Sequence, residues 1–178
     1  MVLENRKEET MEIERKYKVL EIPSNLEQNE RLIIEQGYLC NNPVLRIRKS
    51  NSNYYLTYKS KTDTKVQQEG SAIINNETEL PLTEEAYLIL KKKIEGNVIY
   101  KTRYRIPLWE GLIAELDVFG GALSGLIMAE VEFPDEKSAN DFVPPSWFGK
   151  ELSADQRFSN YYLSQLSSID DLHQNKND

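Results

Sequence analysis

The sequence has one cysteine and one histidine in 178 residues. With Cys40 alone no internal disulfide can form, and a reducing cytoplasmic location is expected. The histidine, His173, lies in a polar stretch near the C-terminus, which removes Ser-His-Asp and Cys-His mechanisms. It also removes the usual zinc sites built from histidine and cysteine. A bound metal would therefore need carboxylate ligands, which favour Mg²⁺ or Mn²⁺.

Long apolar runs and nucleotide-binding motifs are missing as well. No run of about 18 apolar residues occurs, so no transmembrane helix and no membrane partner are expected. The charged first ten residues do not resemble a secretory signal. Neither a Walker A motif nor a GxGxxG motif is present, so a P-loop nucleotide fold is not expected. The net charge is -7 and the pI is near 5.0, which disfavours nonspecific binding of nucleic acid.

The length and composition suit one folded domain. The hydrophobic fraction of 39% can supply a core, and no linker, low-complexity segment or repeat interrupts the chain. Residues 1–10 and 167–178 are polar and lack periodicity. We therefore expect flexible tails at 1–10 and 167–178 around a single domain at 11–166.

Short alternating segments dominate the chain and predict β-strands. The predicted strands are residues 11–20, 43–49, 53–60, 65–75, 98–107, 111–118 and 126–133. Helices are predicted at 83–95, 135–142 and 153–167, with a weaker helical stretch at 28–36. Thr83 suits the N-cap of the first helix, and Ser153 with Gln156 forms a capping-box pattern before the last. Many strands with few helices favour an antiparallel sheet or a barrel.

The charged residues on these strands alternate with apolar ones. Residues two apart on a strand share a face and lie about 7 Å apart. The acidic pairs are Glu12 with Glu14, Glu115 with Asp117, and Glu130 with Glu132. The basic residues in equivalent positions are Lys16, Arg46, Arg48, Lys59, Lys101, Arg103 and Arg105. One face of each of these strands thus carries almost only charged side chains.

A solvated sheet face could carry these charges, but two features favour an enclosed interior. Paired carboxylates repel each other unless a cation or a basic partner lies nearby. The predicted helices also need an apolar surface, and the apolar face of the strands is the only one offered. If helices cover that face, the charged faces must look at each other, as in a barrel with a polar lumen.

A lumen that carries both signs of charge has a chemical use. Carboxylates hold hard divalent cations, whereas arginine and lysine hold phosphate oxygens, arginine through its planar fork. A polyphosphate bridged by metal ions needs both kinds of group together. Such a site could polarise a phosphoryl group and activate a water, as metal-assisted phosphoryl transfer requires.

Residues 12–16 read E-x-E-x-K through Glu12, Glu14 and Lys16. This motif resembles the signature of the triphosphate tunnel metalloenzymes of the CYTH superfamily, in particular their short bacterial branch. The other similar segments, in order, are QGYL at 36–39, LRIR at 45–48, TYKS at 57–60, KTRY at 101–104, ELDVF at 115–119, EVEF at 130–133, PPSWFG at 144–149 and DQRF at 155–158. The resemblance covers roughly residues 11–165.

The resemblance implies an α+β fold, a closed eight-stranded antiparallel β-barrel or tunnel with helices packed outside, which hydrolyses a triphosphate with Mg²⁺ or Mn²⁺. The metal ligands it implies are Glu12, Glu14, Glu130 and Glu132, with Glu115 and Asp117 for a second metal or for orienting water. The substrate ligands it implies are Lys16, Arg46, Arg48, Lys59, Lys101 and Arg103, with Arg157 reaching in from the last helix. The residues expected to carry catalysis are Glu12, Glu14, Lys16, Asp117 and Glu132.

The sequence departs from the family pattern at a few positions. Glu69 matches an expected acidic position and is a further candidate ligand, but Ser71 stands where relatives often carry a second glutamate. Tyr161 and Tyr162 occupy a place where relatives often have a basic residue. Arg105 lies outside the pattern and could pair with Glu69 or face the rim.

Among substrates, inorganic tripolyphosphate is the leading expectation, with pyrophosphate and phosphate as products. The chain is short and shows no aromatic platform for a base. The alternatives are a thiamine or nucleoside triphosphatase, a class IV-type adenylate cyclase, and a non-catalytic module that binds polyphosphate or nucleotide. The acidic pairs disfavour the last, because a pure anion binder gains nothing from them. Relatives often form dimers, so a homodimer stays open.

Overall fold

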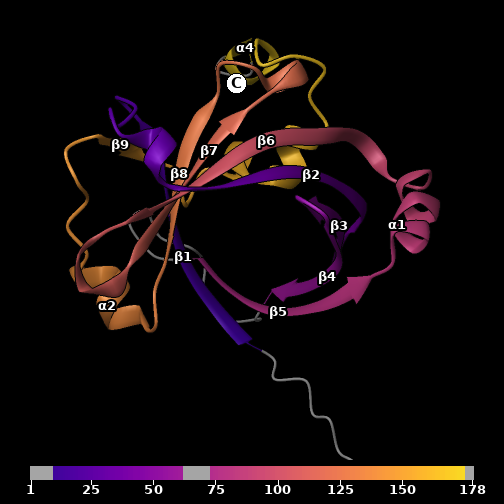
Figure 1. Cartoon of the computed structure of the whole chain (residues 1–178), viewed down its shortest axis with the longest axis horizontal. Coiled ribbons are helices and arrows are strands. Elements are labelled where there is room, and N and C mark those ends of the chain that lie inside the picture. The colour runs from indigo at the N-terminus through magenta and orange to yellow at the C-terminus, as the bar shows by residue number, and fades with distance from the viewer. Residues whose placement is uncertain (1–9, 62–72, 175–178) are drawn as a thin grey trace, which may run out of the picture.

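The computed structural model describes residues 10–61 and 73–174, which form a curled antiparallel sheet with a few short helices (Figure 1). The described strands are β1 (Thr10–Val19), β2 (Glu30–Asn41), β3 (Val44–Ser50), β4 (Asn53–Lys61), β5 (Ile73–Leu82), β6 (Glu95–Pro107), β7 (Ile113–Phe119), β8 (Ile127–Glu132) and β9 (Phe148–Glu151). Their order in the sheet is β5-β4-β3-β2-β6-β7-β8-β1-β9. The antiparallel sheet expected from the alternation is therefore present.

The described helices are short. The α-helices are α1 (Glu84–Lys91), α2 (Glu136–Asp141), α3 (Asn160–Ser164) and α4 (Asp171–Gln174). The 3₁₀ helices are η1 (Leu26–Gln28), η2 (Trp109–Gly111), η3 (Gly121–Leu123) and η4 (Gln156–Phe158). Thr83 caps α1 as predicted, since its hydroxyl accepts a hydrogen bond from the Ala86 N–H at 3.2 Å. None of the described helices has the length and apolarity that a membrane crossing requires.

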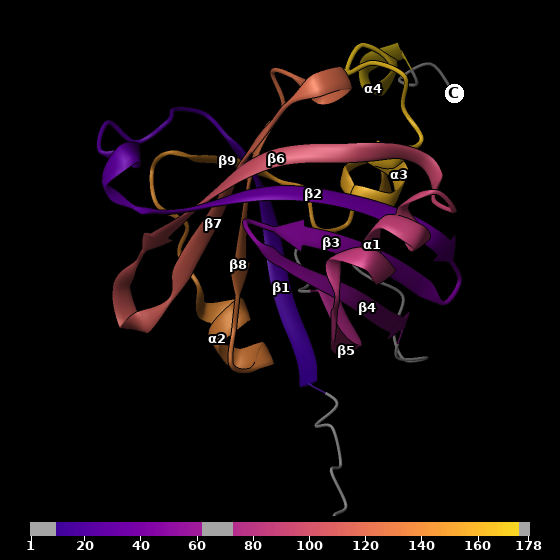
Figure 2. The same cartoon turned by 45° about the vertical axis from the view of Figure 1, so that its right-hand side comes forward.

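The prediction of a closed eight-stranded barrel is wrong in part. The described sheet has nine strands, because residues 148–151 add β9 to one edge of β1. The same edge of β1 pairs with β5 over residues 10–14 and with β9 only from Tyr17 onward. The end strand β5 thus pairs with β1 along only part of its length, and the sheet curls round on itself without forming a simple eight-stranded cylinder (Figures 1 and 2).

The weak helix expected at 28–36 is also wrong, because this stretch runs into β2. Its residues QNERLIIEQ favour a helix by intrinsic propensity, and pairing with neighbours overrides that preference. β2 pairs with β3 on one side and β6 on the other, so its backbone groups find partners on both edges.

The register places the charged residues on one continuous inner face. Residues directly opposite each other in neighbouring antiparallel strands project to the same side. The relevant pairs are Glu14–Glu132, Lys16–Glu130, Glu115–Glu130, Asp117–Arg103, Glu115–Arg105, Arg46–Thr57, Glu79–Thr57 and Glu77–Lys59. The charged faces of the strands therefore look at one another, as the alternation indicates. We call the space they enclose the lumen.

Apolar residues form two clusters, and only the first lies wholly on the outer face. It includes Tyr17, Leu116 and Val131, and Ala139 of α2 and Phe148 of β9 pack into it. α1 also lies on the outside, where the Tyr87 hydroxyl donates to Glu35 on the outer face of β2 at 2.5 Å. The expectation of helices packed outside holds for α1 and α2.

The second cluster lies at one end of the inner face. Part of the segment that was predicted to form an outer helix packs there instead. Inner-face residues such as Tyr38, Ile99 and Met128 pack there against Leu163 of α3 and Leu172 of α4. α3 contacts β2 and β6 from within this end rather than from the outside (Figure 2). Leu172, which lies in the stretch 167–178 that was expected to be a tail, is buried in this cluster.

The single helix predicted at 153–167 is instead two short helices, η4 and α3. Ser153 does not act as the predicted cap, because its hydroxyl accepts from the Lys16 N–H on β1 at 2.9 Å. Asp155 caps η4 and Ser159 caps α3 in its place. The capping-box pattern in the sequence does not show that the backbone of a distant strand hydrogen-bonds to the same serine.

Candidate active site

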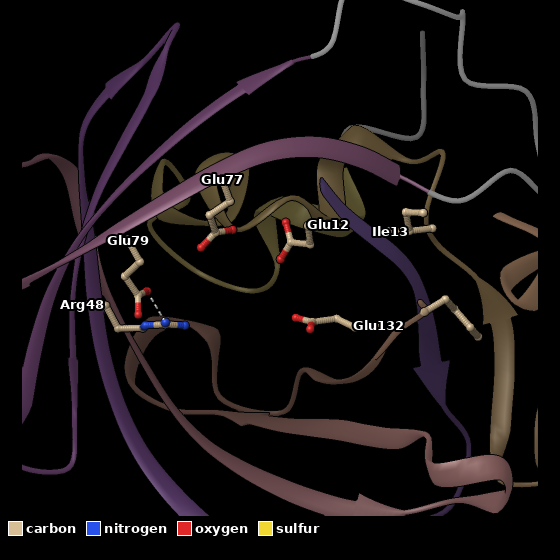
Figure 3. Close-up of a pocket in the computed structure, with 7 residues that line it drawn as sticks. Glu12, Ile13, Arg48, Glu77, Glu79 and Glu132 are labelled. Carbon is tan, nitrogen blue, oxygen red and sulfur yellow. Dashed lines mark hydrogen bonds and ion pairs between the residues drawn. The ribbon is translucent and has the colours of Figure 1, made fainter. Parts of the chain in front are cut away.

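The lumen contains two adjoining cavities of about 280 Å³ each, which share Arg48 and Glu79. The first is mainly acidic, and Figure 3 shows the carboxylates of Glu12, Glu77 and Glu132 pointing into it. The second is lined by three arginines with two carboxylates and a rim of small polar side chains. Its charged lining residues are Arg48, Arg103, Arg105, Glu79 and Glu115. One continuous space therefore brings both signs of charge together.

Glu12, Glu14 and Glu132 form the acidic side of the lumen, on β1 and β8. Glu14 lies directly opposite Glu132 in the register of these strands. Burial, and then the charge of Glu14, raise the pKa of Glu12 to about 7 even though Lys59 lies beside it. Burial, followed by the charges of Glu115 and Glu14, likewise raises the pKa of Glu132. Negative charge is thus in local excess here.

Two further carboxylates, Glu77 and Glu79 on β5, enter the lumen and were not predicted from the sequence. Glu77 lies 2.6 Å from the Lys59 Nζ, and Glu79 accepts from Arg48 at 2.5 Å (Figure 3). They form an acidic pair two residues apart, the same signal that identified the other pairs. The predicted strand stopped at residue 75, where two adjacent asparagines break the alternation. Glu69 and Ser71, which that prediction used, lie outside the described residues.

Lys101, Arg103 and Asp117 form the most buried ion pairs of the lumen. The Lys101 Nζ is 2.6 Å from Asp117, and their side chains are 2% and 0% exposed. Arg103 pairs with Asp117 through its Nε and Nη2 at 2.7 Å, and with Glu115 through its Nη1. Asp117 is therefore held by two cations.

Lys16 and Glu130 lie next to this group. The Lys16 Nζ is 2.9 Å from Glu130, which also accepts from Arg103 at 2.7 Å. Burial alone would raise the pKa of Glu130, but Lys16 and Arg103 hold it well below its usual range. Glu130 is consequently a stable anion that orients two of the expected substrate ligands.

Lys59, Arg46 and Arg48 supply positive charge from the opposite wall. Lys59 bridges Glu12 at 2.5 Å and Glu77 at 2.6 Å, and Arg46 reaches Glu77 at 3.4 Å. The buried Nε atoms of Arg46 and Arg48 have no hydrogen-bond partner among the described residues. These donors leave this wall with capacity to bind an anion.

Tyr38 is a lumen residue whose role the sequence pattern does not indicate. Its buried hydroxyl accepts from the Gln36 Nε2 at 3.2 Å, where the polar lumen meets the second apolar cluster. Burial raises its pKa, although Arg46, Lys59 and Lys16 lie near enough to oppose the rise. The QGYL motif contains both residues, but a motif alone does not tell which side chains turn inward.

The structure does not bring Arg157 together with the other predicted substrate ligands. Its side chain is 32% exposed and donates two hydrogen bonds to Asp155. Arg105 lies at the rim, 3.1 Å from Glu30 and 3.8 Å from Glu115. Tyr161, at a position where relatives of the family often have a basic residue, packs edge-on against Tyr38.

The donor chemistry of the acidic side suits a hard divalent cation. Within residues 10–61 and 73–174, no three acidic, histidine or cysteine side chains already converge on a common metal position. Glu12, Glu14 and Glu132 nevertheless offer only oxygen ligands, and their mutual repulsion would fall if a cation bound between them. These three carboxylates are the ones that fit a metal.

The chain is similar to known proteins over most of its length. An inorganic triphosphatase of Nitrosomonas europaea is 35% identical over 156 residues, which cover 86% of this chain and 96% of that protein. An inorganic triphosphatase of Acetivibrio thermocellus is 37% identical over 134 residues, which cover 74% and 80%. A crystal structure of an inorganic triphosphatase, also 35% identical, matches with a TM-score of 0.63 over 87% of this chain and 95% of that one.

The family assignment rests on most of the chain rather than on one motif. The sequence profile of the CYTH domain matches residues 10–162, from β1 into α3. The matched region contains every inner-face carboxylate and cation described above. This chain belongs to the CYTH domain family.

Proposed function

We propose that this protein hydrolyses inorganic tripolyphosphate to pyrophosphate and phosphate in its lumen. The observation that carries the proposal is one cavity system with an acidic wall at Glu12 and Glu132 and a basic wall at Arg48. The relatives named as inorganic triphosphatases support it. The single cysteine fits a cytoplasmic site of action.

In this proposal, the cations of the lumen bind the nonbridging oxygens of the substrate. They are Lys16, Arg46, Arg48, Lys59, Lys101 and Arg103. The arginines can hold phosphate oxygens with two parallel donors, whereas the lysines supply point charges. Hydrolysis leaves extra negative charge on the departing phosphate groups, and the cations of the lumen stabilise it.

Glu12, Glu14 and Glu132 are proposed to hold Mg²⁺ or Mn²⁺. The cation, when bound, would draw charge from a phosphoryl group and lower the pKa of a water molecule. Glu115 borders the second cavity and is proposed to orient water or a second cation.

Asp117 and Glu130 are proposed to act mainly through the cations they hold. Each is buried and already accepts from two basic side chains. A metal bound there would have to break these ion pairs. Their role is therefore to fix Lys16, Lys101 and Arg103 against the substrate.

A substrate panel tests the proposal. Phosphate release would be measured with tripolyphosphate, ATP and thiamine triphosphate, each with Mg²⁺. We expect tripolyphosphate to be turned over with the highest kcat/KM. Faster turnover of either organic triphosphate, or formation of cyclic AMP from labelled ATP, would overturn the choice of substrate.

A further inference from the structure

The sheet has a seam at Arg15 and Lys16, where one edge of β1 changes partner. The last residue of β1 paired with β5 is Glu14, and the first paired with β9 is Tyr17. Lys16 is also one of the innermost cations of the lumen. A residue of the site thus lies where regular strand pairing is interrupted.

Residues 152 and 153 fill this gap in the backbone pairing. The Lys16 N–H donates to the Ser153 Oγ at 2.9 Å, and the Lys16 carbonyl accepts from the Leu152 N–H at 2.7 Å. Both backbone groups of Lys16 are therefore held from the seam side. On the other edge of β1, Lys16 lies opposite Glu130 of β8. These two residues do not exchange backbone hydrogen bonds, and in such a pair the side chains approach each other closely.

A chain of side chains orients the Ser153 hydroxyl. The hydroxyl donates to the Glu151 Oε1 at 2.7 Å, so its lone pairs remain free to accept from Lys16. Arg15 fixes Glu151 with hydrogen bonds of 3.0 and 2.6 Å and donates to the Ala139 carbonyl of α2 at 2.8 Å. Ser153 itself is only 4% exposed.

We propose that Arg15, Glu151 and Ser153 form a positioning unit that fixes Lys16 in the lumen from the outer side of the sheet. The proposal rests on the function above, because it takes Lys16 as a substrate ligand. Without the Ser153 hydroxyl, the buried Lys16 N–H loses its partner and β1 can shift at the seam. A displacement of about 1 Å is enough to weaken a positioned contact strongly.

The test compares binding of tripolyphosphate in metal-free buffer, where no turnover interferes, by titration calorimetry. We expect Ser153→Ala to raise the Kd about fivefold, because a displaced Lys16 makes a weaker contact with the substrate. Ser153→Thr keeps the hydroxyl and should bind as the wild type does. The matched control is Ser164→Ala, since Ser164 is a buried serine that donates to the Tyr161 carbonyl at 2.6 Å, away from the seam.

A double-mutant cycle separates positioning from general damage. If Ser153 acts through Lys16, Ser153→Ala should not change the Kd of a Lys16→Gln protein. An equal loss of affinity in both backgrounds, or a folded Ser153→Ala protein that binds as the wild type does, would overturn the proposal.

Hydrogen exchange tests the contact without reference to substrate. We expect the Lys16 amide to lose protection in Ser153→Ala, while the amides of β7 keep theirs. If the wild-type protein fails to bind tripolyphosphate, the proposed function fails, and the exchange result still decides whether Ser153 holds Lys16. Unchanged protection of Lys16 would show that it does not.

Discussion

Glu14 shows at the scale of one residue how the acidic wall differs from the rest of the lumen. It faces Glu132 and forms no ion pair with another described residue, whereas Glu130 and Asp117 are each held by cations. We expect Glu14→Gln to lower kcat with Mg²⁺ about 100-fold, because a metal ligand worth several kcal/mol is lost. The melting temperature should stay equal or rise, since repulsion is removed. Normal turnover at limiting Mg²⁺ would contradict this assignment.

For Asp117 we expect that removing the charge lowers the stability of the fold. Its carboxylate is fully buried and compensates two buried cations, Lys101 and Arg103. Removing its charge in Asp117→Asn should lower the free energy of unfolding by about 3–5 kcal/mol, because uncompensated buried charge remains. Chemical denaturation measures the difference. Glu79→Gln is the control, since Glu79 is 30% exposed and pairs with Arg48 near the opening, so its loss should cost much less.

At the scale of elements, α1 is held to β2 by one titratable contact. Glu35 accepts from Lys91 at 2.6 Å and from Tyr87 at 2.5 Å. Burial acts to raise the pKa of Glu35, but these hydrogen bonds lower it below its usual 4.5. A lowered carboxyl pKa stabilises the fold above about pH 4.5, and this stability is lost as the pH falls through the lower folded-state pKa.

This contact predicts a pH-dependent difference between wild type and Glu35→Gln. The wild type should melt higher at neutral pH, and the gap should close below the folded-state pKa of Glu35. Thermal unfolding followed across this range measures it. A gap that is constant with pH would mean that the charge of Glu35 does not stabilise α1.

Most strands could be predicted from the sequence, but not their partners. The period-two alternation located β1, β3, β4, β6, β7 and β8, because each has one charged and one apolar face. It failed at β2, where Glu, Arg and Leu favour a helix until two neighbouring strands pair with them. It also missed Glu77 and Glu79, because Asn75 and Asn76 resemble a turn.

The candidate site could be predicted where charge alternates and not where long-range contacts decide. Lys16, Arg103 and Glu132 lie in the lumen as the pattern indicates. The roles of Ser153 and Tyr38 depend on which distant segment meets them. Arg157 pairs locally with Asp155, a choice that spacing alone does not reveal.

At the scale of the whole molecule, the lumen cations are paired with carboxylates of the protein itself. Lys59 holds Glu12, so a cation that binds Glu12 would release Lys59 for the substrate. We therefore expect Mg²⁺ and tripolyphosphate together to raise the melting temperature more than the sum of their separate effects. Lys59→Met should reduce this excess. A simple sum in the wild type, or an excess unchanged in Lys59→Met, would contradict the coupling.

The central claim is that carboxylates and cations of one lumen act together through a divalent metal on a triphosphate. The most direct measurement is the rate of phosphate release from tripolyphosphate with Mg²⁺ or Mn²⁺ and again after chelation with EDTA. We predict turnover that falls at least about 100-fold on chelation. Equal rates with and without EDTA, or no turnover with either metal, would contradict the account.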